Sequence, residues 1–129
     1  MEQTLDKALG LMGIARKAGK LQTGEETVGA LLLQKRARLT VLANDAGSAV
    51  VRKLQGLAEG TRQQVLEIPC DKQTLGTILG RQSVSAAAFA DVSLALAFVK
   101  ALPEGVANPS LIENLERRVA RVKAKRKKN

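Results

Sequence analysis

A nearly unbroken apolar run over residues 38–43, which ends abruptly in Asn44, Asp45, Ala46 and Gly47, sets the tightest limit on the fold of this chain. The run does not alternate between apolar and polar positions, which is typical of a strand covered on both faces. Such strands lie in the parallel part of α/β sheets, where ligands are met as strands end and helices begin. We therefore predict a buried central strand here, and we expect function at the turn that follows it.

Helical and strand patterns alternate through the rest of the chain. Helical spacing of apolar residues predicts helices over residues 4–17, from Thr23 to about Arg36, and over 48–58, 72–79 and 92–102. Short strands are expected over residues 20–22, 38–43, 65–68 and 84–89. This order predicts an α/β protein, a compact three-layer α/β/α sandwich around a four-stranded mixed sheet.

Polar residues before four of the helices have the spacing of N-terminal caps. Thr23 and Glu26 form the Thr-x-x-Glu pattern of a capping box, in which each side chain bonds the backbone amide of the other residue. Asp71 and Asp91 are predicted to cap the helices over residues 72–79 and 92–102. Asn108 is the predicted cap of a helix in the C-terminal part of the chain, because a proline follows it at the first helical position. The helix starts are thus expected within a residue or two.

The chain is expected to consist of a core domain, residues 1–105, and a basic C-terminal extension, residues 106–129. In the extension, apolar residues at helical spacing predict an amphipathic helix with a basic outer surface. The apolar stripe of this helix consists of Leu111, Leu115, Val119 and Val122. Beyond Val122 no apolar residue anchors the chain, so we expect that end to fray until an acidic partner orders it.

Charge is concentrated in the extension. The formal net charge is +9, of which residues 110–129 contribute +6 through 8 Lys/Arg against 2 Asp/Glu. A basic total favours a polyanionic partner, and nucleic acid is the commonest one. Because the chain has 2 Phe and neither Tyr nor Trp, stacking of unpaired bases on aromatic rings is disfavoured. Structured RNA, recognised by its backbone and shape, fits this composition better.

Several function classes are disfavoured by what the sequence holds. It has 1 Cys and 0 His, so no motif for a metal or a cofactor is present, and we expect Cys70 to be an inert thiol. We find no paired carboxylates or activated nucleophile that would indicate an enzyme. Neither a signal peptide nor an apolar membrane span is recognisable, which places the protein in the cytoplasm, expected as a monomer.

Four segments resemble one known family: residues 11–19 (LMGIARKAG), 23–31 (TGEETVGAL), 39–46 (LTVLANDA) and 75–80 (LGTILG). In this order they are similar to the L-seven-Ae superfamily of ribosomal and kink-turn RNA-binding proteins, in particular to its small bacterial YlxQ-type branch. The resemblance covers residues 4–102 and implies an α/β/α sandwich. It also implies a non-catalytic, ribosome-associated protein that binds structured RNA.

Members of the family grip a kink-turn with three adjacent loops, and the resemblance implies that these loops are the start of the second helix, residues 44–51 and residues 80–84. The family pattern Asn-Glu-x-x-Lys falls on Glu25, Glu26 and Gly29, so one of its three positions matches, which predicts an altered specificity. The implied RNA-binding residues are Lys20, Gly24, Glu25, Glu26, Gly29, Asn44, Asp45, Val51, Arg52, Lys53, Lys72, Arg81, Gln82, Ser83 and Val84.

The basic extension is expected to add phosphate contacts that carry no sequence information. Its candidate residues are Arg117, Arg118, Arg121, Lys123, Lys125, Arg126, Lys127 and Lys128. One alternative remains open: a protein-interaction module on the same fold, which has lost kink-turn recognition and docks a partner through Leu111, Leu115 and Val119. Steep salt dependence of binding would favour RNA over such an apolar contact.

Overall fold

A four-stranded mixed sheet forms the centre of the computed structural model, which describes the backbone of residues 2–128 and the side chains of residues 5–126. The strands are β1 (Leu21–Thr23), β2 (Leu39–Leu42), β3 (Val65–Glu67) and β4 (Ala86–Phe89), in the spatial order β1-β4-β2-β3. Strand β4 runs antiparallel to both of its neighbours, whereas β2 and β3 are parallel.

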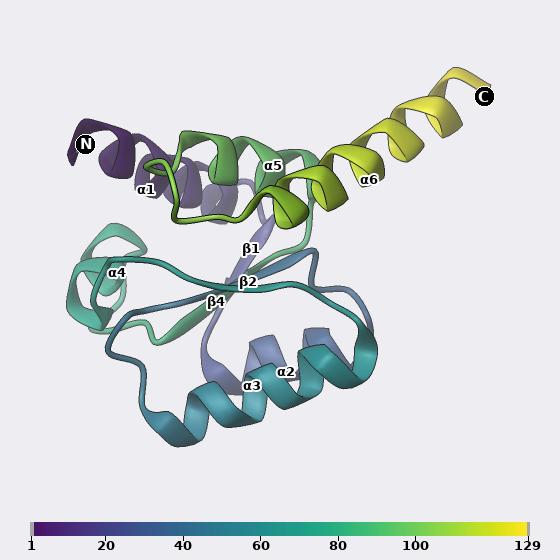
Figure 1. The fold of residues 1–129 in the computed structure, drawn as a ribbon. Helices are drawn as coiled ribbons and strands as arrows, with labels where there is room; N and C mark the ends of the chain where they lie inside the picture. The colour runs from purple at the N-terminus through teal and green to yellow at the C-terminus, as the bar shows by residue number, and fades with distance from the viewer. Residues whose placement is uncertain (1, 129) are drawn as a thin grey trace.

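Helices cover both faces of this sheet (Figure 1). On one face lie α1 (Glu2–Lys17), α5 (Val92–Ala101) and α6 (Pro109–Lys128), with α4 (Lys72–Ile78) beside them. On the other face lie α2 (Glu25–Leu33) and α3 (Ser48–Thr61). The predicted α/β/α sandwich around a four-stranded mixed sheet is therefore confirmed.

Strand β2 is buried along its whole length, as the apolar run predicted. Leu39 and Val41 pack into the apolar cluster under α1 and α5, while Leu42 packs into the cluster under α2 and α3. Thr40 is also fully buried, and its hydroxyl has no hydrogen-bond partner among the described residues. The absence of polar alternation in this run thus reflects a strand with a core on either side.

Three of the four predicted caps are confirmed. The side chains of Asp71, Asp91 and Asn108 accept hydrogen bonds from the amides three residues later, at 2.7, 2.9 and 2.8 Å. The capping box was wrong, because Thr23 is the last residue of β1, where it pairs with Ala87. Gly24, with φ 103, takes the N-cap position of α2 instead and has no side chain to cap it.

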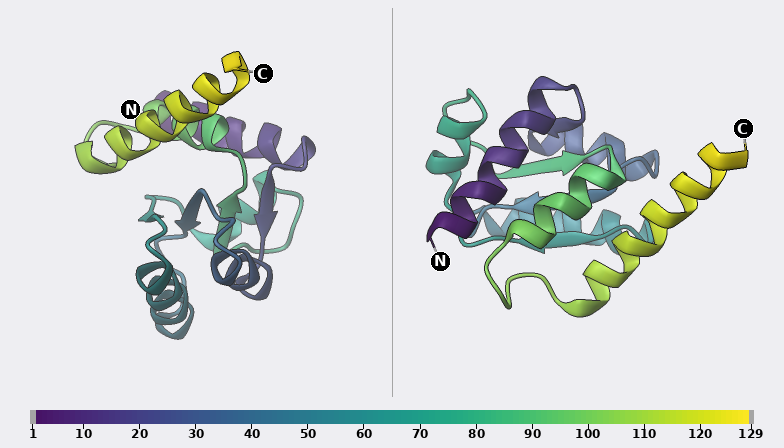
Figure 2. Two further views of the ribbon diagram at one scale, coloured as in Figure 1. Left: turned by 90° about the vertical axis from the view of Figure 1, so that its right-hand side faces the viewer. Right: turned by 90° about the horizontal axis from the view of Figure 1, so that it is seen from above.

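Helix α6 packs on α5 and belongs to the same apolar cluster as the core (Figure 2). Leu111, Leu115 and Val119 are buried in that cluster, so the alternative in which they dock a partner was wrong: the chain's own core covers them. The helix continues past Val122 to Lys128. The fraying expected at this end stays a prediction.

Candidate nucleic-acid interface

The loops predicted from the sequence to bind RNA lie together at one end of the strands. Strands β1 and β2 end here and β4 begins here, because Thr23 pairs with Ala87 and Leu42 pairs with Ala86. Strand β3 also ends here, because Glu67 pairs in parallel with Leu42. The amide of Gly24 donates to the carbonyl of Ala86 at 3.0 Å, which ties the start of α2 to β4. We call this side of the molecule the loop edge; it lies on the left in Figure 1.

Backbone and side-chain hydrogen bonds hold three of these loops in register. The carboxylate of Asp45 accepts from the amide of Lys72 at 2.8 Å, which links the β2–α3 loop to the start of α4. The carbonyl of Lys72 accepts from the amide of Val84 at 3.0 Å, which links α4 to the turn before β4. Asp45 is therefore a positioning residue that aligns the second loop with the third.

The N-termini of α2 and α3 both open at the loop edge, and neither has a side-chain cap. Their N-cap residues are Gly24 and Gly47, for which no side-chain hydrogen bond to the helix exists. The first amides of a helix have no intrahelical partner and lie at its positive end, so two sets of donors face the solvent here. Sequence reasoning missed this feature at α2 because it assigned the cap to Thr23.

Glu25 and Lys53 form an ion pair across the starts of α2 and α3, with 3.1 Å between the Lys53 Nζ and the Glu25 Oε2. Both side chains are more than a third exposed, so the pair contributes little to stability. Its effect is on charge: the ammonium offsets the carboxylate that would otherwise repel phosphate. Arg52 and Glu26 are exposed beside this pair.

Gly29 does not face the loop edge as a binding residue would. It is buried in the contact between α2 and α3, where a Cβ would lie 3.8 Å from the Lys53 Cε and 3.7 Å from a Leu57 methyl. The aliphatic part of Lys53 therefore covers the position at which the family pattern places a lysine. Position 29 itself lacks a cation, and the side chain of Lys53 from α3 passes over it.

The third loop is held by a close backbone contact at Gly76. A Cβ at this position would lie 2.7 Å from the Ser83 Cα and 2.8 Å from the Arg81 carbonyl oxygen, so glycine lets the turn pack directly on α4. Arg81, Gln82 and Ser83 are exposed on this turn. The Arg16 guanidinium also lies near Gly80, with Nη1 at 3.6 Å from where a Cβ would be. Arg16 is a cation near this loop that sequence reasoning missed.

Two predicted site residues lie away from the exposed surface of the loop edge, and a third is partly covered. Lys20 lies at the opposite end of β1, where its carbonyl accepts from the amide of Ala90, so it does not join the loop edge. Val84 is 3% exposed and packs in the core. Val51 is half-buried against the cluster under α2 and α3. An apolar residue in a loop is often recruited to the core, and spacing alone does not separate the two roles.

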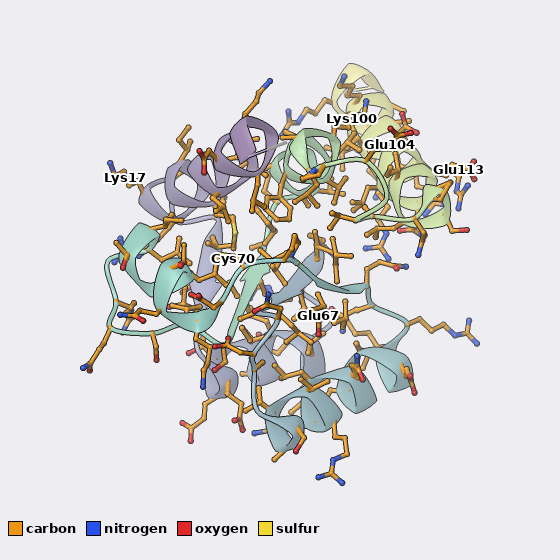
Figure 3. The ribbon with its side chains drawn as sticks, turned by 60° about the vertical axis from the view of Figure 1, so that its left-hand side comes forward. Lys17, Glu67, Cys70, Lys100, Glu104 and Glu113 are labelled. Atoms are coloured by element: carbon orange, nitrogen blue, oxygen red, sulfur yellow. The ribbon has the colours of Figure 1, made fainter. Side chains whose placement is uncertain are left out.

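Acidic groups near α4 affect the pKa of the Cys70 thiol, which lies between α4 and the sheet (Figure 3). Burial raises the pKa of the Cys70 thiol, and the charges of Asp71 and Asp45 raise it further. The amide of Thr74 donates to the Asp71 carboxylate and lowers the pKa of that group. The thiol therefore stays protonated near neutral pH, in keeping with the inert role expected for it.

The basic residues of α6 lie away from the loop edge, above the loops at the other end of the strands (Figure 1). Arg118, Arg121 and Lys125 line a cleft there, whereas Arg117, Lys123 and Arg126 do not. The side chains of Lys127 and Lys128 lie outside the described residues. Within residues 5–126, no three His, Cys, Asp or Glu side chains are grouped so as to hold a metal ion, and no helix combines the length and apolarity needed to span a membrane.

The fold and the loop edge define a class of protein: a three-layer sandwich in which helix N-termini and two short loops meet at one end of a mixed sheet. The family model for the ribosomal protein L7Ae/L30e/S12e/Gadd45 family matches residues 6–96, and the chain belongs to this family. The match ends inside α5, so α6 lies outside it. The family predicted from the sequence is thus confirmed.

Two relatives place the chain more closely. It is 35% identical over 69 residues to the RNA-binding protein YlxQ of Enterococcus faecium, an alignment that covers 54% of this chain and 62% of that protein. The fold is also similar to the structure of a protein of unknown function from Bacillus halodurans C, with a TM-score of 0.68 and 26% identity. That similarity covers 74% of this chain and 95% of the other. The first relative agrees with the YlxQ-type branch predicted from the sequence. The second shows the same fold.

Proposed function

We propose that this protein binds structured RNA at the loop edge and acts as a ribosome-associated binding protein without catalysis. The observation that carries the proposal is the pair of uncapped N-termini, of α2 and α3, that open side by side in a chain of this family. Backbone amides held by the sheet bind phosphate and base-edge oxygens without any side-chain reordering. Ribosomal RNA as the partner would place the protein in the cytoplasm.

A kink-turn-like element with altered specificity is the RNA that these residues fit. Glu26 retains the family's glutamate and is exposed at the first turn of α2, where it can accept hydrogen bonds from base edges. Glu25 replaces an amide-bearing residue, and its charge is offset by Lys53 at 3.1 Å. A site with one matching position and one cation supplied from α3 is expected to bind a standard kink-turn weakly and a variant of it better.

The decisive measurement is the affinity of the full chain for a kink-turn RNA and for a straight duplex of equal length, by fluorescence anisotropy at several salt concentrations. We expect the protein to prefer the kinked RNA, and we expect Lys72→Gln with Arg81→Gln to reduce that preference without lowering the thermal midpoint. Lys72 and Arg81 are at the loop edge and make no salt bridge among the described residues.

The matched control is Lys7→Gln with Lys17→Gln, which removes the same charge from α1. Both lysines are exposed, and Lys17 points away from the body of the molecule (Figure 3). Equal loss of preference in the two double variants would mean that net charge, and not the loop edge, determines binding. No preference for the kinked RNA in the unaltered protein would contradict recognition of a kink.

A further inference from the structure

A second, strongly basic cleft lies at the end of the sheet opposite the loop edge. It has a volume of about 470 Å³ and is lined by residues of α6, the α2–β2 loop and the α3–β3 loop. The two loops lie on the right of Figure 1. Six of its ten lining residues are cationic and none is acidic; the cations are Lys35, Arg38, Arg62, Arg118, Arg121 and Lys125. We call this the α6 cleft.

The cations of the α6 cleft have no acidic partners among the described side chains. The salt bridges within residues 5–126 are Lys53–Glu25 and Lys100–Glu116, and neither involves a residue of the cleft. The acidic residues of α6 itself, Glu113 and Glu116, lie in its first half, and Figure 3 shows Glu113 near the start of the helix. Six like charges thus share one cleft, and none of them forms a salt bridge with a described carboxylate.

Helix dipoles do not account for this concentration of charge. The C-termini of α2 and α3 point to the cleft, and each is equivalent to roughly half a negative charge, so together they offset about one of the six cations. Arg118 shows the result: partial burial lowers its pKa, and the charges of Arg38 and Arg121 lower it further. A bound anion would remove this repulsion.

The walls of the cleft are fixed before any ligand arrives. The Gln63 side chain accepts from the amide of Ala37 at 2.9 Å and donates to the carbonyl of Leu32 and the hydroxyl of Thr61, both at 2.6 Å. These bonds join the α2–β2 loop to the α3–β3 loop, the two loops that carry Lys35 and Arg62.

Two of the six cations occupy positions whose backbone conformation favours glycine. Lys35 and Arg62 have left-handed backbone conformations, with φ 58 and φ 57, at the C-terminal ends of α2 and α3. Glycine is the usual residue at such positions, because it has no Cβ to strain the backbone. The chain thus keeps a long cationic side chain on each wall of the cleft, at some cost in backbone strain.

We propose that the α6 cleft is a second RNA site, which binds the sugar-phosphate backbone of a segment other than the one held at the loop edge. This inference rests on RNA being the partner of the loop edge, and it adds that the protein holds two RNA segments at once. The lining contains no aromatic residue, and its apolar members are Val92 and Val122, so the cleft is suited to phosphates and not to stacked bases.

The spacing of the cations favours a chain of phosphates over a single one. Arg118, Arg121 and Lys125 line the cleft along one side of α6, and seven residues of helix span roughly 10 Å. A nucleic-acid strand advances by about 3.4 Å per phosphate along a duplex axis, so roughly three successive phosphates match this length.

The test compares two triple variants on the same helix. Arg118→Gln, Arg121→Gln and Lys125→Gln remove three charges from the cleft, and Arg117→Gln, Lys123→Gln and Arg126→Gln remove three charges from α6 outside it. Glutamine keeps a helix propensity close to that of the residues it replaces, and thermal midpoints confirm that both variants fold. The probe is a plain RNA duplex of twelve base pairs, titrated by anisotropy at several salt concentrations.

We expect the cleft triple to weaken duplex binding at least tenfold at low salt. It should also flatten the slope of log affinity against log salt by about 2–3, because each phosphate contact contributes about 0.9 to that slope. The outer triple is expected to change the slope by less than about 1. Equal effects of the two triples would overturn the proposal, since net charge alone would explain them. Binding of inorganic tripolyphosphate that excludes the duplex at equimolar concentration would overturn the assignment to RNA.

Failure of this proposal and failure of the loop edge give different patterns. Lys72→Gln with Arg81→Gln is expected to leave duplex binding by the α6 cleft within about threefold of the unaltered protein, because those residues lie at the other end of the strands. If duplex binding were lost in this loop variant and kept in the cleft triple, the loop edge would be the duplex site and the α6 cleft would not. If the kinked RNA showed no preference but the cleft triple still lost duplex binding, only the loop-edge proposal would fail.

Discussion

Gly76→Ala is the change that most directly tests how the third loop is held against α4. In a solvent-exposed helix this substitution stabilises, because alanine has the higher helix propensity by about 1 kcal/mol. Position 76 differs because a Cβ there would meet three backbone atoms of residues 81–83 at 2.7–2.8 Å. Backbone cannot rotate away as a side-chain end can, so the turn itself must move.

The expected size of the effect follows from these distances. Carbon atoms in ordinary contact are about 3.5 Å or more apart, so the turn has to shift by roughly 0.7 Å. Overpacking of this kind costs about 1–3 kcal/mol, against a helix gain of up to about 1 kcal/mol. We therefore expect a net loss of up to about 2 kcal/mol, or up to roughly 10 °C in thermal midpoint for a domain of this size.

Gly56→Ala is the matched control. Gly56 is exposed within α3, and a Cβ there would meet nothing within 4 Å. This variant is expected to raise the thermal midpoint by roughly 2–5 °C, so the two substitutions should shift stability in opposite directions. Thermal unfolding followed by circular dichroism gives both values. A midpoint for Gly76→Ala equal to or above that of Gly56→Ala would refute the close contact between α4 and the turn.

Three further outcomes are expected. Deletion of residues 110–129 should lower the thermal midpoint by more than about 10 °C, because each buried apolar side chain of α6 contributes about 1.5–3 kcal/mol to stability. Deletion of residues 124–129 alone should leave the midpoint within about 2 °C of the unaltered protein. Equal midpoints for the two deletions would contradict the packing of α6. Thr40→Val should raise the midpoint by roughly 3–5 °C, since it removes a buried hydroxyl with no described partner; a lower midpoint would show that the hydroxyl is bonded. Cys70 should react with a disulfide reagent more than about tenfold faster in urea than in the native state at pH 8, because its raised pKa keeps the native thiol protonated. For the same reason, the free energy of unfolding should decline as pH rises above about 8.5. A fast reaction of the native protein would contradict the burial of this thiol.

The architecture could be predicted from the sequence because several local signals agreed on it. The apolar run of β2 and the caps at Asp71, Asp91 and Asn108 each fixed an element independently of the others. The capping box at Thr23 failed because a three-residue strand claimed that residue, and pairing in such short strands is decided by the partner strand, which the local pattern does not contain.

The site could be predicted only in part, for a different reason. Asp45 and Lys72 were singled out separately, and the hydrogen bond that joins them spans 27 residues, so only the fold reveals it. Lys20 is close in sequence to the first loop but lies at the other end of β1. The α6 cleft cannot be recognised from the sequence because its cations come from three separate segments, of which only the last is recognisable there as a basic tail.

The two ends of the sheet differ in how they would bind the same polymer. At the loop edge the donors are amides of α2 and α3 whose positions are set by β1 and β2, so a change in RNA shape moves phosphates and bases out of reach of fixed partners. In the α6 cleft the donors are long, mobile cationic side chains that can follow any backbone, so affinity there depends on salt and hardly on sequence. RNA discrimination is therefore expected to persist at high salt, where only the loop edge still contributes, while overall affinity falls. Preference between a kinked and a straight RNA, measured as salt rises, should stay constant or increase; a preference that declined in step with affinity would mean that the cleft, and not the loop edge, makes the distinction.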